Sequence, residues 1–406
     1  MDGIDDPFLY PRFSLAERDR RWKAVRAKMH EQNLDVIIVP NNTGHSTDFQ
    51  SNARYLSHVG GGGDADVAVV FPLEGEVTAI ATSCNPRWQP NVQSWTTDVR
   101  EARRRYGKVA AERVKELGLG DKPRIGIAGL GGGTRTPEGT IGHQFWIQIR
   151  EAYPNAELVD ATPILTQVRY VKSEEEIDWL RIGAALSDAG FDSLHAGTKP
   201  GLDERELSAL VEDAYIRHGG TTMIHYIGVT AMANPHLFVP PQYPSTRKVQ
   251  SGDVVFCELS AFWWDYAGQL LRTFFVDAGP TPLYRDLLAT AEAAFDAVTA
   301  VIRHGTAMEE ILGAADVVER NGFTICDDLV HGFGGGYFQP IIGSRSRPAG
   351  PLPKMTLEEN MTVVVQPNVT TAETDGCKRA GVQTGELIRV TKTGFEKLHR
   401  TPRGAG

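Results

Sequence analysis

The chain lacks the cysteine patterns of thiolate zinc sites and redox motifs. Its four cysteines, Cys84, Cys257, Cys326 and Cys377, are widely spaced and form no Cys-x-x-Cys pair. Scattered, unpaired cysteines fit a reducing compartment. The first twelve residues are acidic and contain proline, and no basic segment followed by an apolar one indicates a signal peptide. We therefore expect a cytoplasmic protein.

Long apolar runs and an excess of basic charge are also missing. No stretch approaches the ~18 consecutive apolar residues that span a bilayer. The net charge of -9 argues against non-specific binding of nucleic acid, which requires clustered lysine and arginine. We therefore expect a soluble protein that acts on a small molecule, with neither nucleic acid nor membrane as a partner.

Neither glycine-rich segment matches a nucleotide-binding motif. The cluster from Gly129 to Gly133 follows a predicted strand, but Thr134 and Pro137 stand where a dinucleotide fingerprint opens a helix. The second cluster begins at His331 and lacks the Lys-Ser/Thr of a P-loop. Its glycines either form a turn or let the backbone pass close to a pocket.

Hydrophobic periodicity divides the chain into two domains. Strands predicted at 34–40, 66–72, 76–81 and 124–128 alternate with helices at 14–32, 97–117 and 140–152, which is typical of an α/β domain and covers residues 1–168. Helices at 172–194, 203–219 and 282–303 and strands at 254–259, 271–276 and 361–366 follow. They predict an α+β domain over residues 169–406.

Several side chains in the second region are candidates for chemistry. Glu258 ends the apolar run Val254–Cys257, so its carboxylate either points to solvent or is buried with a partner. His236 lies in a turn-like loop, where a histidine is either solvated or functional. Trp263 and Trp264 are either core and interface residues or part of a substrate clamp.

Three segments, in their order along the chain, resemble the creatinase, prolidase and aminopeptidase P family. They are Val168–Ser173 with the long helix that follows, Val249–Val255 through Arg272–Phe274, and Leu329–Gly332 through Leu357–Pro367 to Gly381–Gly394. The resemblance covers nearly the whole chain. It implies a smaller α/β N-terminal domain, a C-terminal domain with the α+β "pita-bread" fold, and a homodimer.

Metal-dependent members of this family hold two divalent ions with Asp, Asp, His, Glu and Glu. The corresponding positions in this chain are Glu258, Gln269, His331, Gln366 and Gly385, with Glu386 next to the last. Divalent ions of this kind are held by several anionic oxygens. Two neutral amides and a glycine cannot supply them, so we predict no tightly bound pair of metal ions and no cofactor.

Creatinase is a metal-free member of the family, and His236 resembles its catalytic histidine. Its two catalytic glutamates correspond to Leu271 and Thr384, and its substrate-binding arginine falls near Asp64 and Asp66. An acidic pair there suits a neutral or cationic substrate group better than a carboxylate. Creatine is therefore not the expected substrate.

The resulting prediction is a metal-independent hydrolase or lyase that cleaves a C–N or related bond of a small molecule. His236 and Glu258 are its acid and base, and His331 polarises or positions the substrate. Gln269, Gln366, Glu386, Trp263, Trp264, Asp64 and Asp66 are the predicted substrate-binding residues. One alternative is a peptidase-like or lyase enzyme with a single metal held by Glu258, His331 and either Glu386 or Asp265. The other is a pita-bread scaffold that only binds.

Overall fold

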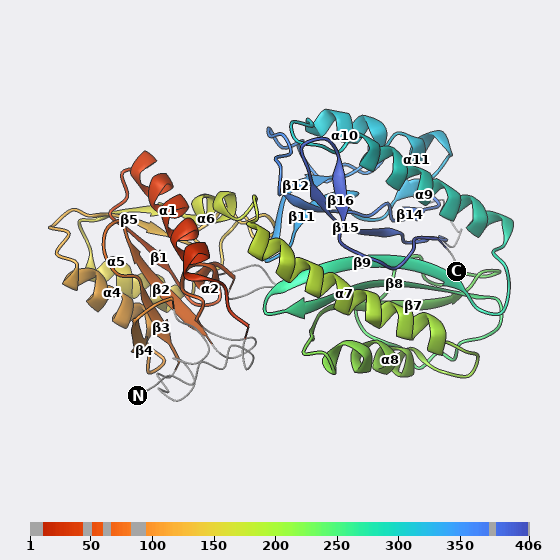
Figure 1. The fold of residues 1–406 in the computed structure, drawn as a ribbon, viewed down its shortest axis with the longest axis horizontal. Helices are drawn as coiled ribbons and strands as arrows, with labels where there is room; N and C mark the ends of the chain where they lie inside the picture. The colour runs from red at the N-terminus through yellow and green to blue at the C-terminus, as the bar shows by residue number, and fades with distance from the viewer. Residues whose placement is uncertain (1–10, 44–50, 60–65, 83–94, 373–378, 405–406) are drawn as a thin grey trace. The chain divides into compact units, whose positions relative to one another are not determined.

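The computed structural model describes residues 11–43, 51–59, 66–82, 95–372 and 379–404. The chain forms two compact units, Met1–Arg169 and Tyr170–Gly406. No helix in the described part of the chain has the length and apolar character needed to cross a membrane. Both units are drawn in Figure 1.

The N-terminal unit is a mixed sheet with helices on its faces. Its described elements are α1 (Leu15–Glu31), β1 (Val36–Val39), α2 (Ser51–Ser57), β2 (Val67–Pro72), β3 (Thr78–Ala81), β4 (Asp98–Glu101), α4 (Tyr106–Glu116), β5 (Arg124–Ile127), α5 (His143–Ala152), β6 (Glu157–Asp160) and α6 (Thr162–Val168). The strand order is β4-β3-β2-β1-β5-β6. The single helix predicted at 97–117 is wrong in its first part, because 98–101 pair in parallel with β3 as an edge strand before α4 begins.

The C-terminal unit is built on a curved antiparallel sheet. Its elements are α7 (Glu174–Gly197), α8 (Glu204–Ile216), β7 (Thr221–Ala231), β8 (Asp253–Trp263), β9 (Tyr266–Phe275), α9 (Pro282–Val301), α10 (Met308–Ala314), α11 (Val317–Arg320), β10 (Thr324–Ile325), β11 (Val330–Phe333), β12 (Tyr337–Ile342), β13 (Thr362–Val365), β14 (Val369–Thr370), β15 (Gly385–Val390) and β16 (Phe395–Lys397). The main strand order is β12-β11-β13-β15-β9-β8-β7. The sequence did not indicate β7.

Helix α7 packs closely on this sheet because two glycines face each other across the contact. Figure 1 shows α7 and α8 lying along β7, β8 and β9. A Cβ at Gly268 would come within 2.4 Å of the Ala184 Cα, and a Cβ at Gly183 within 2.6 Å of the Tyr266 carbonyl oxygen. This close approach holds β9 in place and, with it, the neighbouring Gln269.

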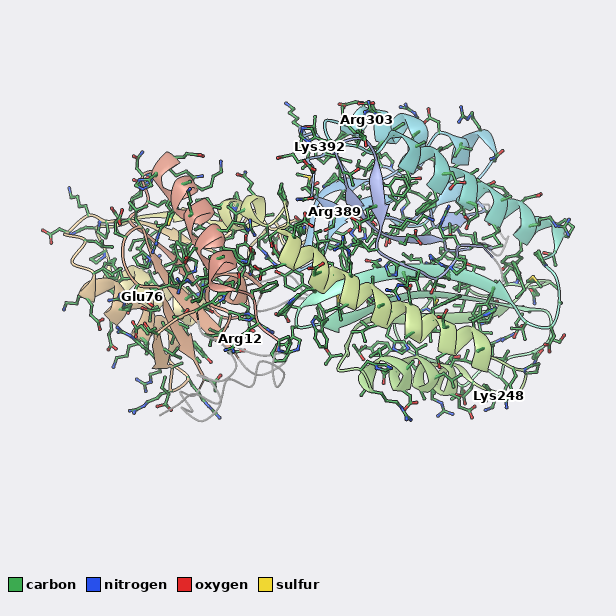
Figure 2. All side chains as sticks on the ribbon, in the orientation of Figure 1. Arg12, Glu76, Lys248, Arg303, Arg389 and Lys392 are labelled. Atoms are coloured by element: carbon green, nitrogen blue, oxygen red, sulfur yellow. The ribbon has the colours of Figure 1, made fainter. Side chains whose placement is uncertain are left out.

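Polar contacts hold the start of α7 on the sheet. Ser173 caps the helix in a capping box with Glu176. Arg389 on β15, labelled in Figure 2, forms an ion pair with Glu174 and donates to the Asn360 side chain at 2.9 Å. These contacts connect the first turn of α7 to β15, the strand that lies beside β9.

Candidate functional site

Strands β8 and β9 bring three polar side chains to one face of the sheet. Glu258 pairs with Leu271, and Ser260 pairs with Gln269. Side chains alternate along a strand, and paired residues share a face. Glu258, Ser260 and Gln269 therefore point to the same side, away from α7 and α8.

The neighbouring strands add further residues to this face. Gly385 pairs with Leu271, and His331 on β11 pairs with Val364, two residues before Gln366. A Cβ on Gly385 would meet the Gln366 Cα at 2.8 Å, so these two residues are also neighbours. By alternation, His331 and Gln366 share the face of Glu258 and Gln269.

A chain of hydrogen bonds crosses the face. The Gln269 Nε2 donates to Glu258 Oε1 at 2.8 Å and to Gln366 Oε1 at 3.0 Å. The Gln366 Nε2 donates to the Asp328 Oδ1 at 2.6 Å and to its carbonyl oxygen at 3.2 Å. Carboxylates only accept hydrogen bonds, so each amide must turn its nitrogen toward its carboxylate neighbour. The network thus determines the orientation of both amides.

Asp328 also connects this chain to His331. The Tyr337 hydroxyl donates to Asp328 Oδ2, and the Tyr337 ring stacks on the His331 ring with centroids 4.3 Å apart. His331 is 1% exposed, and Asp328 is 5% exposed. The structure therefore joins Glu258, Gln269 and Gln366 in one chain of hydrogen bonds and connects it to His331 through Asp328 and Tyr337, two residues that the sequence analysis missed. The roles of these side chains in catalysis and substrate binding stay predictions.

The sequence contains a signal for Asp328 but none for Tyr337. Asp327 and Asp328 stand directly before a buried strand, which is an unusual place for two carboxylates. Tyr337 follows the glycine cluster that begins at Gly334, and nothing local indicates its contact. Its position depends on the pairing of β11 with β12.

His236 lies elsewhere on the same face. Its Nδ1 is 2.8 Å from the Thr230 Oγ1, which also accepts a hydrogen bond from the His236 backbone nitrogen at 2.9 Å. Tyr226 pairs with Glu258, and Thr230 lies four residues further along β7, about 13 Å away. Both hydrogen bonds that hold His236 go to Thr230, so the structure does not join it directly to Glu258.

Glu386 points away from the polar face. It pairs with Leu270 and Val365, which directly adjoin Gln269 and Gln366 along their strands and therefore face the opposite side of the sheet. Its Oε2 accepts a hydrogen bond from Arg272 Nη2 at 2.7 Å, and both side chains are 1% exposed. The structure therefore contradicts the predicted substrate contact of Glu386, because strand alternation places it in a buried ion pair on the opposite side.

The two tryptophans and Asp265 also lie away from Glu258. Trp263 is five residues beyond Glu258, so it faces the other side of β8, where it packs with the core under α8. Trp264 and Asp265 form the tight turn between β8 and β9, about 20 Å along the hairpin from Glu258. These positions do not fit a substrate clamp or a shared metal site at Glu258.

The predicted acidic pair falls in the N-terminal unit. Asp64 lies outside the described residues. Asp66 accepts a hydrogen bond from the Asn41 side chain at 3.0 Å, at the start of β2. Its part in substrate binding stays a prediction.

The residues on the polar face do not fit a pair of divalent ions. Within the described ranges, no three His, Cys, Asp or Glu side chains group so that they could hold a metal ion. Gln269 and Gln366 turn N–H groups toward the carboxylates, and an N–H group cannot ligate a cation. Gly385 supplies no side chain, and Glu386 is turned to Arg272.

The described cysteines are not nucleophiles. Burial raises the pKa of the Cys257 thiol to about 12 and that of the Cys326 thiol to about 12. A thiol attacks as its thiolate, which is scarce at neutral pH when the pKa is this high. The groups available for proton transfer at the site are therefore carboxylates and imidazoles.

Comparison with known proteins agrees with this architecture. Residues 178–392 match the model of metallopeptidase family M24, and residues 21–171 match the creatinase/prolidase N-terminal domain. The chain belongs to metallopeptidase family M24. The expected two-domain organisation, with an α/β N-terminal domain and an α+β pita-bread C-terminal domain, is thereby confirmed.

Relatives and solved structures cover most of the chain at low identity. An uncharacterised hydrolase/peptidase of Sinorhizobium fredii is 24% identical over 412 residues, covering 96% of this chain and 97% of the relative. A creatinase of a Bacillus species is 27% identical over 274 residues, covering 66% and 62%. The Xaa-Pro dipeptidase from Bacillus anthracis has a TM-score of 0.75 at 20% identity, covering 96% of this chain and 99% of that one. The family assignment supports a hydrolase of the creatinase, prolidase and M24 type.

Proposed function

We propose that this protein hydrolyses a C–N or related bond of a small molecule by acid–base catalysis without a metal ion. The observation that supports this proposal most directly is the hydrogen-bonded chain Glu258–Gln269–Gln366–Asp328, which we call the amide bridge. Gln269 and Gln366 stand between Glu258 and Asp328 and donate hydrogen bonds to both carboxylates. Amide N–H groups thus stabilise these acidic groups where metal-dependent relatives would use cations.

Glu258 is the proposed base. Its side chain is half-buried, whereas Gln269 and Gln366 are 1% and 2% exposed, so it is the part of the bridge that a water molecule reaches. The hydrogen bond from Gln269 holds one carboxylate oxygen in place. The carboxylate takes a proton from water, and the water oxygen bonds to the substrate carbon as the bond to nitrogen breaks.

His236 is the proposed acid that protonates the leaving nitrogen. The Thr230 hydroxyl can accept a hydrogen bond from Nδ1–H or donate one to Nδ1, so it holds the ring in either protonation state. This contact leaves Nε2 for the substrate. Because His236 and Glu258 are separated along the sheet, a substrate lies between them rather than displacing a direct contact.

His331 and Asp328 position the reacting groups. Asp328 holds the amide bridge through Gln366 and holds the Tyr337 hydroxyl, whose ring supports His331. The proposed role of His331, which lies on the same face as the proposed base, is to polarise the substrate.

Turnover by chelator-treated protein tests the proposal. A panel of N-substituted amino acids, cyclic amides and small amines is screened for release of amine or ammonia, with and without added Mn²⁺ or Co²⁺. Activity that persists in chelator and is lost in His236→Ala and Glu258→Gln supports the proposal. The control variants His218→Ala and Glu309→Gln alter exposed residues and should keep full activity.

Other outcomes distinguish the alternatives. Activity that chelator abolishes and added metal restores would refute the metal-independent proposal and support the metal-dependent alternative, in line with the family's description as metallopeptidases. Full turnover in both site variants would refute the roles given to His236 and Glu258. Saturable binding of panel compounds without any turnover would indicate a binding module.

A further inference from the structure

Two buried polar atoms beside Glu258 have no hydrogen-bond partner among the residues that the structure describes. They are the Ser260 Oγ and the Gln269 Oε1, and both residues are 1% exposed. Ser260 and Gln269 are a cross-strand pair, and Glu258 lies two residues before Ser260 on the same face. The Cβ atoms of these three residues therefore lie about 5 to 7 Å from one another.

The hydrogen-bond network requires that the amide oxygen of Gln269, and not its nitrogen, is the unpartnered atom. Its nitrogen is required by Glu258 on one side and by the carbonyl of the Gln366 amide on the other. A flipped amide would set two oxygens against each other at both contacts. A buried acceptor without a donor is destabilising, and such groups often mark a functional role.

We propose that Ser260, Gln269 and Glu258 form a subsite for a cationic N–H donor, an amidinium or ammonium group of the substrate. The Gln269 Oε1 accepts one N–H, and the Ser260 hydroxyl oxygen accepts a second. The adjacent carboxylate of Glu258 favours positive charge. The proposal rests on the proposed function, because it names the substrate class for the same site.

The subsite is reached past Glu258. The Ser260 and Gln269 atoms are shielded from solvent, whereas the Glu258 side chain is half-buried. On this proposal, a ligand head group would meet Glu258 before the two deeper atoms. The same closeness allows another arrangement, in which the Ser260 hydroxyl rotates to bond Gln269 and no ligand binds, and the experiment separates the two.

Ligand-observed NMR titration with three probes of nearly equal shape tests the subsite. Acetamidinium carries a positive charge and four N–H donors, acetamide is neutral with two, and acetate is an anion with none. We expect measurable binding in the order acetamidinium, acetamide, acetate. The variant Ser260→Ala should weaken acetamidinium binding about 5-fold, the equivalent of one hydrogen bond, and the volume-conserving Ser260→Cys should weaken it in the same direction.

Ser193→Ala is the matched control, since this serine lies on α7 and donates to the Leu210 carbonyl oxygen away from the site. It should leave binding unchanged. Acetate binding as well as acetamidinium would overturn the proposal, and so would unchanged affinity in both Ser260 variants. Because the assay measures equilibrium binding, it does not depend on turnover. Loss of catalysis with intact acetamidinium binding refutes only the proposed reaction, and catalysis without acetamidinium binding refutes only the subsite.

Discussion

Replacing Gln366 by Glu changes one atom of the amide bridge and should make stability depend on pH. Gln366 is 2% exposed, and its Nε2 donates to Asp328 Oδ1 at 2.6 Å. In Gln366→Glu an oxygen takes the place of that nitrogen, so two carboxyl groups must share a proton in the folded state. The pKa of the pair is then raised above the unfolded value of about 4.3.

The sign and size of the effect follow from proton linkage. A raised folded-state pKa stabilises the protein below the unfolded pKa, and that contribution is lost as the pH rises toward the folded pKa. The stability of Gln366→Glu relative to the wild type should therefore fall by about 1.4 kcal/mol per pH unit above pH 5, reaching up to about 4 kcal/mol at pH 8.

Urea unfolding followed by tryptophan fluorescence between pH 4.5 and pH 8 measures this difference. Gln242→Glu is the control, because Gln242 is exposed and its variant should follow the wild type at every pH. A divalent ion such as Mn²⁺ should recover part of the loss in Gln366→Glu at pH 8 and leave the wild type unchanged. A stability difference that stays constant across this pH range would refute the contact between the amide and Asp328.

Three further predictions concern other parts of the molecule. Burial, together with nearby arginine charge, lowers the pKa of His58 to about 3. The neutral ring therefore contributes its full stabilisation above pH 6.5, and the free energy of unfolding should fall by about 2 to 3 kcal/mol between pH 6.5 and pH 4.5. His58→Gln should reduce this pH dependence in urea titrations. Gly385→Ala places a Cβ 2.4 Å from a carbonyl oxygen of β13 and should lower the melting temperature by several degrees, whereas Gly313→Ala, which meets no atom within 4 Å, should not. Burial alone would raise the pKa of Asp188, but the hydrogen bond and charge of His399 lower it overall. Asp188→Asn should therefore lower the free energy of unfolding by about 1 to 3 kcal/mol at pH 7. A difference of the same size well below pH 3.8 would contradict this ionic contribution of Asp188.

The amide bridge explains how this chain keeps the fold of its family with a different set of polar groups. Positions that resemble metal ligands form one connected network, Glu258, Gln269 and Gln366, in which every amide nitrogen meets an acceptor. Buried carboxylates need compensation, and N–H donors provide it in place of cations. The network thus supplies N–H donors to these carboxylates from the chain itself, and this is the basis on which we propose metal-independent chemistry.

The sequence alone determined the family and the division into an α/β and an α+β region. It also shows that Gln269, Gln366 and Gly385 are not carboxylates, while their correspondence to metal-ligand positions stays a prediction. These conclusions depend on residue identity and local periodicity, which need no knowledge of distant contacts. Strand parity between Glu258 and Trp263 was also available from the sequence, because alternation along a strand is a local property.

Only the tertiary structure decided which of these side chains meet. Asp328 and Tyr337 join the site through pairing of β11, β12 and β13, and Glu386 leaves it because the register of β15 turns it toward Arg272. A shift of one residue in pairing reverses the face of every side chain. Register is set by packing across the whole sheet, so no local pattern in the sequence could have predicted these contacts.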